Sequence, residues 1–228
     1  MSTSQLYRVS GLGLLIGAVG FVVHVVLRSL ITAGLDPSAF ATQGLWVPVN
    51  GLGLASALLV LLGLPAMYAA VAGSMGRLGF LGVVLFAVVW IFFGVFLSLY
   101  GVLLLPWLAE KAPALVAAGA PPPPSFVIAF VVGLVAWLVG AALLAIPFIR
   151  GRLQPRWVGY ALLASAVWMV VGNLIIAPAG PATDLAINLL SNLGPVLLLV
   201  PIGHLGSRMW AAGAPANPVE RSIDPSRR

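Results

Sequence analysis

Six long apolar stretches constrain this chain more than any other feature of its sequence. They cover residues 11–31, 45–72, 78–105, 126–149, 157–177 and 185–209. A helix needs about 20 predominantly apolar residues to cross a hydrocarbon layer of about 30 Å, and each stretch meets that requirement. Backbone amides in lipid must be hydrogen-bonded within their own segment, so these stretches are expected to be helices. The sequence predicts an all-α, polytopic membrane protein with six transmembrane helices in residues 1–210.

The composition would leave a soluble protein with too little polar surface. Hydrophobic residues make up 61% and charged residues 7% of the 228 positions, whereas soluble domains contain about 25% charged residues. The chain contains no cysteine, which excludes disulfides, thiol catalysis and Cys-ligated metal centres. Residues 211–228 are polar and rich in proline, and predict a disordered cytoplasmic tail.

The basic residues predict how the chain is oriented in the membrane. If the N-terminus is cytoplasmic, Arg28 and Lys111 lie outside and the other nine of the eleven basic residues lie inside. Cytoplasmic segments of membrane proteins carry such an excess of Lys and Arg, so both termini are expected in the cytoplasm. The basic residues therefore indicate membrane orientation, with lipids as partners and no nucleic acid. The abundance of Arg, Ala, Gly and Pro indicates a GC-rich bacterial genome, and hence the bacterial inner (plasma) membrane.

A repeated pattern suggests internal symmetry. Three arginines open the odd-numbered stretches in "RVSGLGLLIGAV", "RLGFLGVVLFAV" and "RWVGYALLASAV", at Arg8, Arg77 and Arg156. Three prolines lie near the predicted cytoplasmic ends of the even-numbered stretches, at Pro65, Pro147 and Pro201. The pattern favours three helical hairpins related by an axis along the membrane normal. Chance matching in a biased composition is the alternative.

Polar residues within the stretches gather near the predicted outer ends. The candidate ligand-binding residues are His24, Arg28, Asn50, Asn173, Asn188 and Asn192, with Asp36 and Asp184 at the rim. His24 and Arg28 are four residues apart, as are Asn188 and Asn192, so each pair shares one helix face. If these faces meet, they form an outward-facing pocket in which the Arg28 guanidinium binds a carboxylate or phosphate.

Structural roles also explain the same residues, and they are the leading interpretation of the sequence. Arg28 would then extend to the outer headgroups, or form an ion pair with Asp36 or Asp184. The asparagines would join helices by hydrogen bonds.

The sequence contains no recognisable catalytic motif. Paired carboxylates, HExxH, GxSxG and a phosphate-binding loop are all missing, and none of the five acidic residues lies in the middle of an apolar stretch. We therefore expect no catalytic residue, no metal and no cofactor. His24 and His204 fall on opposite sides of the predicted membrane, which disfavours a haem held by both. An enzyme acting on a lipid or quinone would have to use one of these two histidines as its base.

Three further motifs accompany the arginine-opened stretches. They are "LGLPAMYAAVAG" at the end of the second stretch, "LQPRWVGYALL" at the start of the fifth, and "PWLAEKAPAL" in an outer loop. Together they resemble small six-helix integral membrane proteins of GC-rich bacteria, which form uncharacterised families of unknown function. The resemblance implies the fold and topology and supplies no functional residues.

Three classes of function follow from these observations. The leading prediction is a structural or accessory membrane component, whose small-residue helix faces, such as Gly13 and Gly17, suit a homo-oligomer or a membrane-protein partner. The second is a transporter, channel or small-ligand receptor that uses the outer pocket. The third is a membrane enzyme acting on a lipid or quinone.

Overall fold

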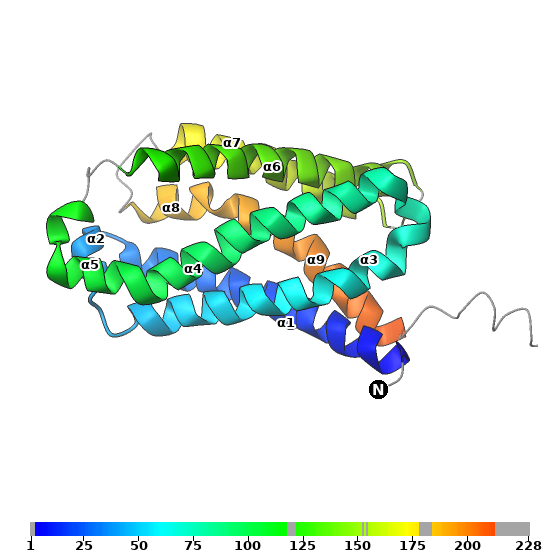
Figure 1. Cartoon of the computed structure of the whole chain (residues 1–228), viewed down its shortest axis with the longest axis horizontal. Helices are drawn as coiled ribbons and strands as arrows, with labels where there is room; N and C mark the ends of the chain where they lie inside the picture. The colour runs from blue at the N-terminus through cyan, green and yellow to red at the C-terminus, as the bar shows by residue number, and fades with distance from the viewer. Residues whose placement is uncertain (1–2, 118–121, 152, 154, 178–183, 213–228) are drawn as a thin grey trace, which may run out of the picture.

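The structure, a computed structural model, describes residues 3–117, 122–151, 153, 155–177 and 184–212. Within these residues the chain is helical and contains no strand, and its long helices lie along the long axis of one bundle (Figure 1). The predicted all-α fold is confirmed for this part of the chain. Residues 213–228 of the predicted tail lie outside the described residues.

The helical elements include three π-helical segments (η1, η2 and η4) and one short 3-10 helix (η3). In chain order they are α1 (Thr3–Thr32), α2 (Pro37–Phe40), α3 (Trp46–Trp90), η1 (Ile91–Phe96), α4 (Leu97–Leu99), η2 (Tyr100–Leu104), α5 (Leu105–Lys111), η3 (Pro113–Leu115), α6 (Pro124–Ile149), α7 (Trp157–Val171), η4 (Gly172–Ile176), α8 (Leu185–Ser191) and α9 (Leu193–Ala212). Five segments of the described chain are long and apolar enough to span a membrane: Ser4–Thr32, Trp46–Ala69, Gly76–Lys111, Pro124–Ile149 and Trp157–Ile176. Each corresponds to one of the first five predicted stretches.

The second and third spans are joined by a tight reversal within α3. Gly76 has φ 63° and ψ −166° there, a backbone conformation that is open almost only to glycine because it lacks a Cβ atom. Figure 1 shows α3 turning back on itself at the end of the bundle where the N-terminus lies. One glycine therefore allows two antiparallel spans to follow each other without a long loop.

The predicted sixth helix over residues 185–209 is not one continuous helix. It consists of α8 and α9, which meet at Asn192 with a bend of 46°. Pro195 stands in the first turn of α9 and has no N–H to donate to the Ser191 carbonyl, and its ring disfavours a helix running through that carbonyl. The pair is long and apolar enough to form a sixth, broken span.

The helices pack as neighbouring hairpins. In chain order, α1 packs against α3, α3 against α6, and α7 against α9, while α9 also closes the bundle against α1. The three repeat prolines lie inside helices, at Pro65 in α3, Pro147 in α6 and Pro201 in α9. Threefold symmetry of the hairpins stays a prediction.

Glycines allow the closest helix contacts. A Cβ atom on Gly11 of α1 would lie 2.7 Å from the Gly206 carbonyl oxygen of α9, and one on Gly206 would lie 2.6 Å from the Gly11 carbonyl oxygen. A Cβ atom on Gly17 would lie 2.7 Å from the Ser56 carbonyl oxygen of α3, whereas one on Gly13 would meet nothing closer than 3.6 Å. In lipid, van der Waals contact of this kind holds helices together.

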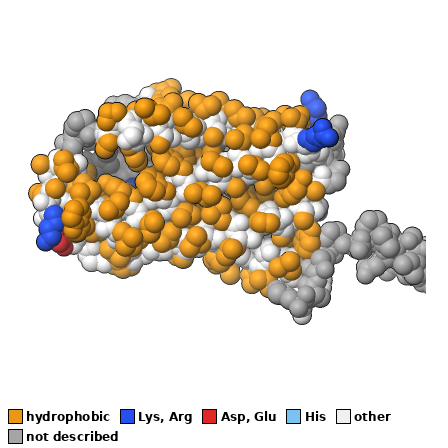
Figure 2. Space-filling view, viewed as in Figure 1, with side chains coloured by type: hydrophobic (Ala, Val, Ile, Leu, Met, Phe, Trp, Pro, Cys, Tyr) orange, Lys and Arg blue, Asp and Glu red, His pale blue; other side chains and the backbone are white. Residues whose placement is uncertain are grey.

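The outside of the bundle is suited to lipid. Leu62 is 75% exposed and Ile128 65% exposed, although both lie within the spans. Figure 2 shows hydrophobic side chains covering the middle of the molecule, with the charged side chains visible at its two ends. Because water would penalise so large an apolar surface, this arrangement indicates a membrane protein.

Candidate functional site

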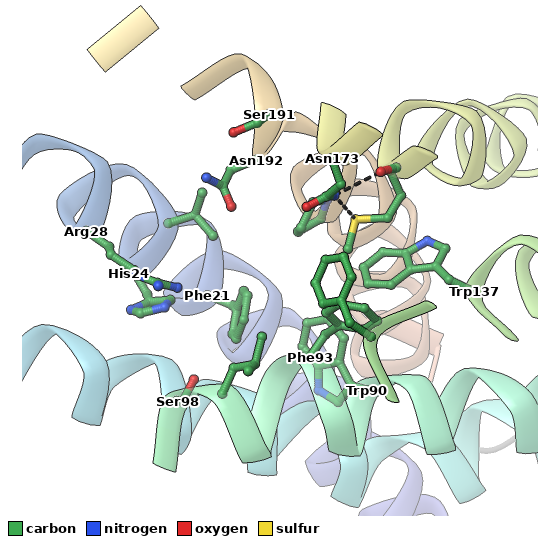
Figure 3. Close-up of a pocket in the computed structure, with 15 residues that line it drawn as sticks. Phe21, His24, Arg28, Trp90, Phe93, Ser98, Trp137, Asn173, Ser191 and Asn192 are labelled. Carbon is green, nitrogen blue, oxygen red and sulfur yellow. Dashed lines mark hydrogen bonds between the residues drawn. The ribbon is translucent and has the colours of Figure 1, made fainter. Parts of the chain in front are cut away.

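A cavity of about 210 Å³ lies between α1, the η1–α4 segment, α6, η4 and the α8–α9 break. It is near the end of the bundle that carries α2 and α5, where Figure 2 shows the surface hollowed. Four of the six candidate ligand-binding residues line it: His24, Arg28, Asn173 and Asn192 (Figure 3). Asn50 and Asn188 do not line it.

Arg28 is the one formally charged residue among the described residues that line the cavity. Its side chain bends back toward His24 (Figure 3), following the tendency of helical side chains to point toward the helix N-terminus. The guanidinium carbon lies 5.7 Å from the centre of the Trp46 ring, which holds the cation by a cation–π contact. Arg28 retains exposed surface, so it is available to a ligand.

No acidic side chain in the described part of the chain neutralises Arg28. The salt bridge found there joins Lys111 to Glu110 on the surface, at 3.9 Å. Asp36 Oδ1 instead accepts hydrogen bonds from the Ser38 amide and hydroxyl, at 2.9 and 2.6 Å, and caps α2. Asp184 Oδ1 accepts from the Ile187 amide at 3.0 Å and caps α8. The two predicted rim residues therefore act as helix caps, and neither forms an ion pair with Arg28.

His24 is held rigidly at the wall of the cavity. The residue is 3% exposed, and its Nδ1 lies 2.8 Å from the Val49 carbonyl oxygen of α3. A carbonyl oxygen only accepts, so Nδ1 is the donor, and in the neutral ring Nε2 keeps its lone pair. Gly53 makes room for the ring, because a Cβ atom there would lie 2.8 Å from three ring carbons. The imidazole thus has one fixed tautomer and a second nitrogen left for another partner.

Asn188 and Asn192 share a helix face as predicted, but they have different surroundings. Asn188 Nδ2 donates to the Thr32 hydroxyl at 3.0 Å, and Ser29 Oγ donates to Asn188 Oδ1 at 3.4 Å. These bonds join α8 to α1. Asn192 Nδ2 donates to the Asn188 carbonyl at 2.8 Å and to Asn188 Oδ1 at 2.7 Å, which ties the helix break to the same network. Asn188 therefore joins helices, whereas Asn192 both stabilises the break and lines the cavity.

Asn173 reaches the cavity from an irregular turn of helix. It lies in the π-helical segment η4, where its Nδ2 donates to the Met169 carbonyl at 2.8 Å (Figure 3). Gly172 lets this segment approach the α8 end, since a Cβ atom there would lie 2.5 Å from the Ser191 carbonyl oxygen. The π-helical turn changes the direction of the side chains that follow it, and such turns are frequent at functional sites.

Asn50 belongs to a separate packing contact next to the cavity. It is 1% exposed and its Nδ2 donates to the Trp46 carbonyl at 2.9 Å. Gly101 of η2 lies so close that a Cβ atom there would be 2.5 Å from Asn50 Oδ1, and the Gly101 carbonyl accepts a 2.7 Å hydrogen bond from Trp46 Nε1. Asn50 thus joins α3 to η2, and Trp46 in turn supports Arg28.

The aromatic wall of the cavity was not among the predicted site residues. Five aromatic side chains from three spans line it: Phe21, Trp90, Phe93, Phe130 and Trp137. Two spacings in the sequence could have indicated three of them, Phe21, Trp90 and Phe93, whereas neither spacing includes Phe130 or Trp137. Phe21 is three residues before His24, and Trp90 is three residues before Phe93, so each pair shares a helix face.

His204 is separate from this site. It lies in an apolar groove between α1 and α9, and its ring centre is 5.0 Å from that of Trp157. His24 and His204 therefore belong to different sites. The described residues contain no group of three or more His, Asp or Glu side chains that could hold a metal ion.

Comparison with known proteins gives no relative for this chain: no family model, curated protein or solved structure matches it. The function of this chain is therefore inferred from the geometry of the cavity.

Proposed function

We propose that this chain is a membrane protein that binds a small ligand in the outer cavity, as a receptor or transporter does. The convergence of Arg28, His24 and Asn192 on one cavity carries the proposal, because these residues come from α1 and from the break between α8 and α9. Charged side chains within membrane spans commonly mark ligand pathways, and no carboxylate of the described residues pairs with the exposed Arg28. A ligand anion would supply the missing partner.

The irregular helices around the cavity also support ligand binding. Discontinuous helices in transporters commonly form the binding site, because a break presents free backbone groups and side chains to the ligand. Here the α8–α9 break and the π-helical segments η1 and η4 all contribute lining residues, namely Asn192, Phe93 and Asn173.

We further propose that the cavity faces the outside of a bacterial inner membrane and that both termini are cytoplasmic. The arginines that begin or end the spans support this, since Arg8, Arg77, Arg150 and Arg156 belong to the end of the bundle opposite α2 and α5. That end would be cytoplasmic under the positive-inside rule.

A structural or accessory role is the second candidate. The hydrogen bonds of Asn188 with Thr32 and Ser29, and those of Asn50 and Trp46, join helices and require no ligand. A structural role therefore explains part of the polar cluster. It does not explain the charge and the aromatic lining of the cavity, which the ligand-binding role does explain.

Cysteine accessibility tests the proposed function directly, because the chain has no native cysteine. Ser98→Cys and Ser191→Cys place a thiol in the cavity lining, while Ser165→Cys is a matched control at a position that is 0% exposed and outside the cavity. Gln43→Cys, in the exposed loop before α3, is the positive control. A membrane-impermeant thiol reagent added to intact cells is expected to label Gln43→Cys, Ser98→Cys and Ser191→Cys and to spare Ser165→Cys.

Two results would contradict the proposal. If Gln43→Cys reacts while both cavity thiols remain unlabelled in folded protein, the cavity is closed to water and the structural role is favoured. If Gln43→Cys reacts only after the membrane is permeabilised, the proposed orientation is reversed.

A further inference from the structure

We infer that the ligand of the outer cavity is a small aromatic monocarboxylate. This inference rests on the proposed function and adds the chemical class of the ligand. Three features of the cavity lead to it: its single charge, its aromatic wall and its volume.

The charge indicates one anionic group. Among the described residues that line the cavity, Arg28 is the single formally charged one, and none is Asp, Glu or Lys. A guanidinium presents a planar fork of donors that matches the two oxygens of a carboxylate. One cation neutralises one negative charge, so a monoanion is favoured over a dianion, which would bring an unpaired charge into the apolar cavity.

The opposite wall indicates a flat, apolar body. Phe93 is at the centre of this wall, with its ring centre 5.3 Å from that of Phe130 and 5.5 Å from that of Trp137. Phe21 and Trp90 continue the wall, 4.8 Å apart between ring centres. Figure 3 shows Phe93, Trp90 and Trp137 on one side of the cavity and Arg28 with His24 on the other, with Phe21 between them and its ring centre 5.1 Å from that of His24. Aromatic rings prefer offset or edge-to-face contact with one another, so a ring in the ligand gains most from this wall.

The volume limits the ligand to about one ring and a short head group. A cavity of about 150 Å³ accommodates benzene, and this cavity measures about 210 Å³. The remaining volume suits a carboxylate directed at Arg28. His24 Nε2 is close to that head group and would accept a hydrogen bond from a ring hydroxyl or from water.

The main competing class is an aromatic cation. Clusters of aromatic rings bind ammonium groups through cation–π contacts, and the same wall could act in this way. Arg28 would repel such a ligand across a small cavity of low dielectric. The carboxylate is therefore favoured, and benzylamine serves as the test of the alternative.

Binding of four simple probes to the purified full-length protein tests the inference. Benzoate has the ring and the charge, benzamide is its neutral isostere, benzylamine has the opposite charge, and inorganic phosphate is an anion without a ring. A change in tryptophan fluorescence reports binding, since Trp90 and Trp137 of the seven tryptophans line the cavity. Protection of Ser98→Cys from labelling is a second readout, specific to the cavity. Because a charge-assisted pair is lost with benzamide, benzoate is expected to bind at least about tenfold more tightly than benzamide.

Arg28→Gln is expected to remove this preference, so that benzoate and benzamide bind alike. Arg8→Gln is the control, because Arg8 is an exposed arginine of the same helix at the other end of the bundle. If Arg28→Gln does not fold, protection of Ser98→Cys in the otherwise native chain decides between benzoate and benzamide.

The outcomes separate this inference from the proposed function. Tighter binding of benzamide, benzylamine or phosphate than of benzoate would overturn the aromatic monocarboxylate and leave a ligand-binding cavity. If none of the four probes binds while the cavity thiols react, the aromatic monocarboxylate is likewise overturned and a ligand-binding cavity remains. Unreactive cavity thiols would overturn both the aromatic monocarboxylate and the proposed function. Stronger binding of phosphate than of benzoate would point to a phosphate-bearing molecule such as a lipid head group.

Discussion

The crossing of α1 and α9 gives the sharpest prediction about stability. Gly206→Ala adds one Cβ atom at a place where the Gly11 carbonyl oxygen would be 2.6 Å away, the Leu14 Cβ atom 2.7 Å and the Leu15 nitrogen 2.9 Å. Two of these three atoms belong to backbone, which cannot move out of the way as a side-chain end can. Relief to an ordinary contact of about 3.4 Å requires the helices to separate by roughly 0.8 Å, and overpacking of this kind costs about 1–3 kcal/mol.

Gly13→Ala is the matched control. It makes the same chemical change in α1, where the nearest atom to the new Cβ is the Leu59 carbonyl oxygen at 3.6 Å. Both substitutions gain up to about 1 kcal/mol of intrinsic helix propensity, so this gain cancels when the two variants are compared. Gly206→Ala is expected to be less stable than Gly13→Ala by about 1–3 kcal/mol.

Thermal unfolding in detergent measures this difference. For a chain of this size, 1 kcal/mol corresponds to about 2–4 °C in Tm, so Gly206→Ala should unfold at a clearly lower temperature than Gly13→Ala. Equal Tm values for the two variants would refute the close crossing of α1 and α9. A Tm for Gly206→Ala above that of the native chain would refute it more strongly.

Two further predictions concern the turn in α3 and the polar network. Gly76→Ala is expected to destabilise the fold by about 1–3 kcal/mol through its positive φ alone, since a Cβ atom there meets nothing within 4 Å. Gly51→Ala, which also meets nothing within 4 Å but lies in regular helix, should be neutral or stabilising. Equal effects of the two substitutions in thermal melts would rule out the turn. A double-mutant cycle of Asn188→Ala and Thr32→Val is expected to give a coupling energy of about 0.6–2 kcal/mol in denaturant unfolding, whereas strictly additive effects would mean that the 3.0 Å hydrogen bond contributes nothing.

The polar residues near the outer end divide between two roles, joining helices and lining the cavity. Asn50 and Asn188 are joined to neighbouring helices by short hydrogen bonds. Arg28 and His24 line a cavity, and Arg28 has no carboxylate partner among the described residues. Hydrogen bonds between helices require no charge, so the helix-joining role explains Asn50 and Asn188 and leaves the charge of Arg28 to the cavity.

Part of the candidate site could be read from residue spacing. His24 and Arg28 share a helix face because they are four residues apart, and the structure brings both to the cavity. The same spacing applies to Asn188 and Asn192, but the chain breaks at Asn192 and leaves only that residue in the lining. Spacing predicts neighbours on one helix, whereas a break depends on the local effect of Pro195 and on the helices packed around it.

The aromatic wall could not be predicted from any one helix. Phe93 and Trp137 come from different spans, and their ring contact of 5.5 Å depends on how the two helices are rotated about their axes. Helix rotation in a membrane is not set by a polar and an apolar face as in a soluble protein, because lipid and core are both apolar. It is set by close contacts such as that of Gly133 with Phe93, whose ring carbon would lie 2.8 Å from an added Cβ atom.

The sequence by itself determined that this chain is a bundle of helices with an apolar outside, because length and hydropathy are summed along each segment and depend on no distant contact. It also determined which polar residues were available near one end of that bundle. Only the tertiary structure decided which of them meet. Arg28 and Asn192 are 164 positions apart in the sequence, and they line one cavity because glycine contacts, π-helical turns and the α8–α9 bend set the rotation of each helix.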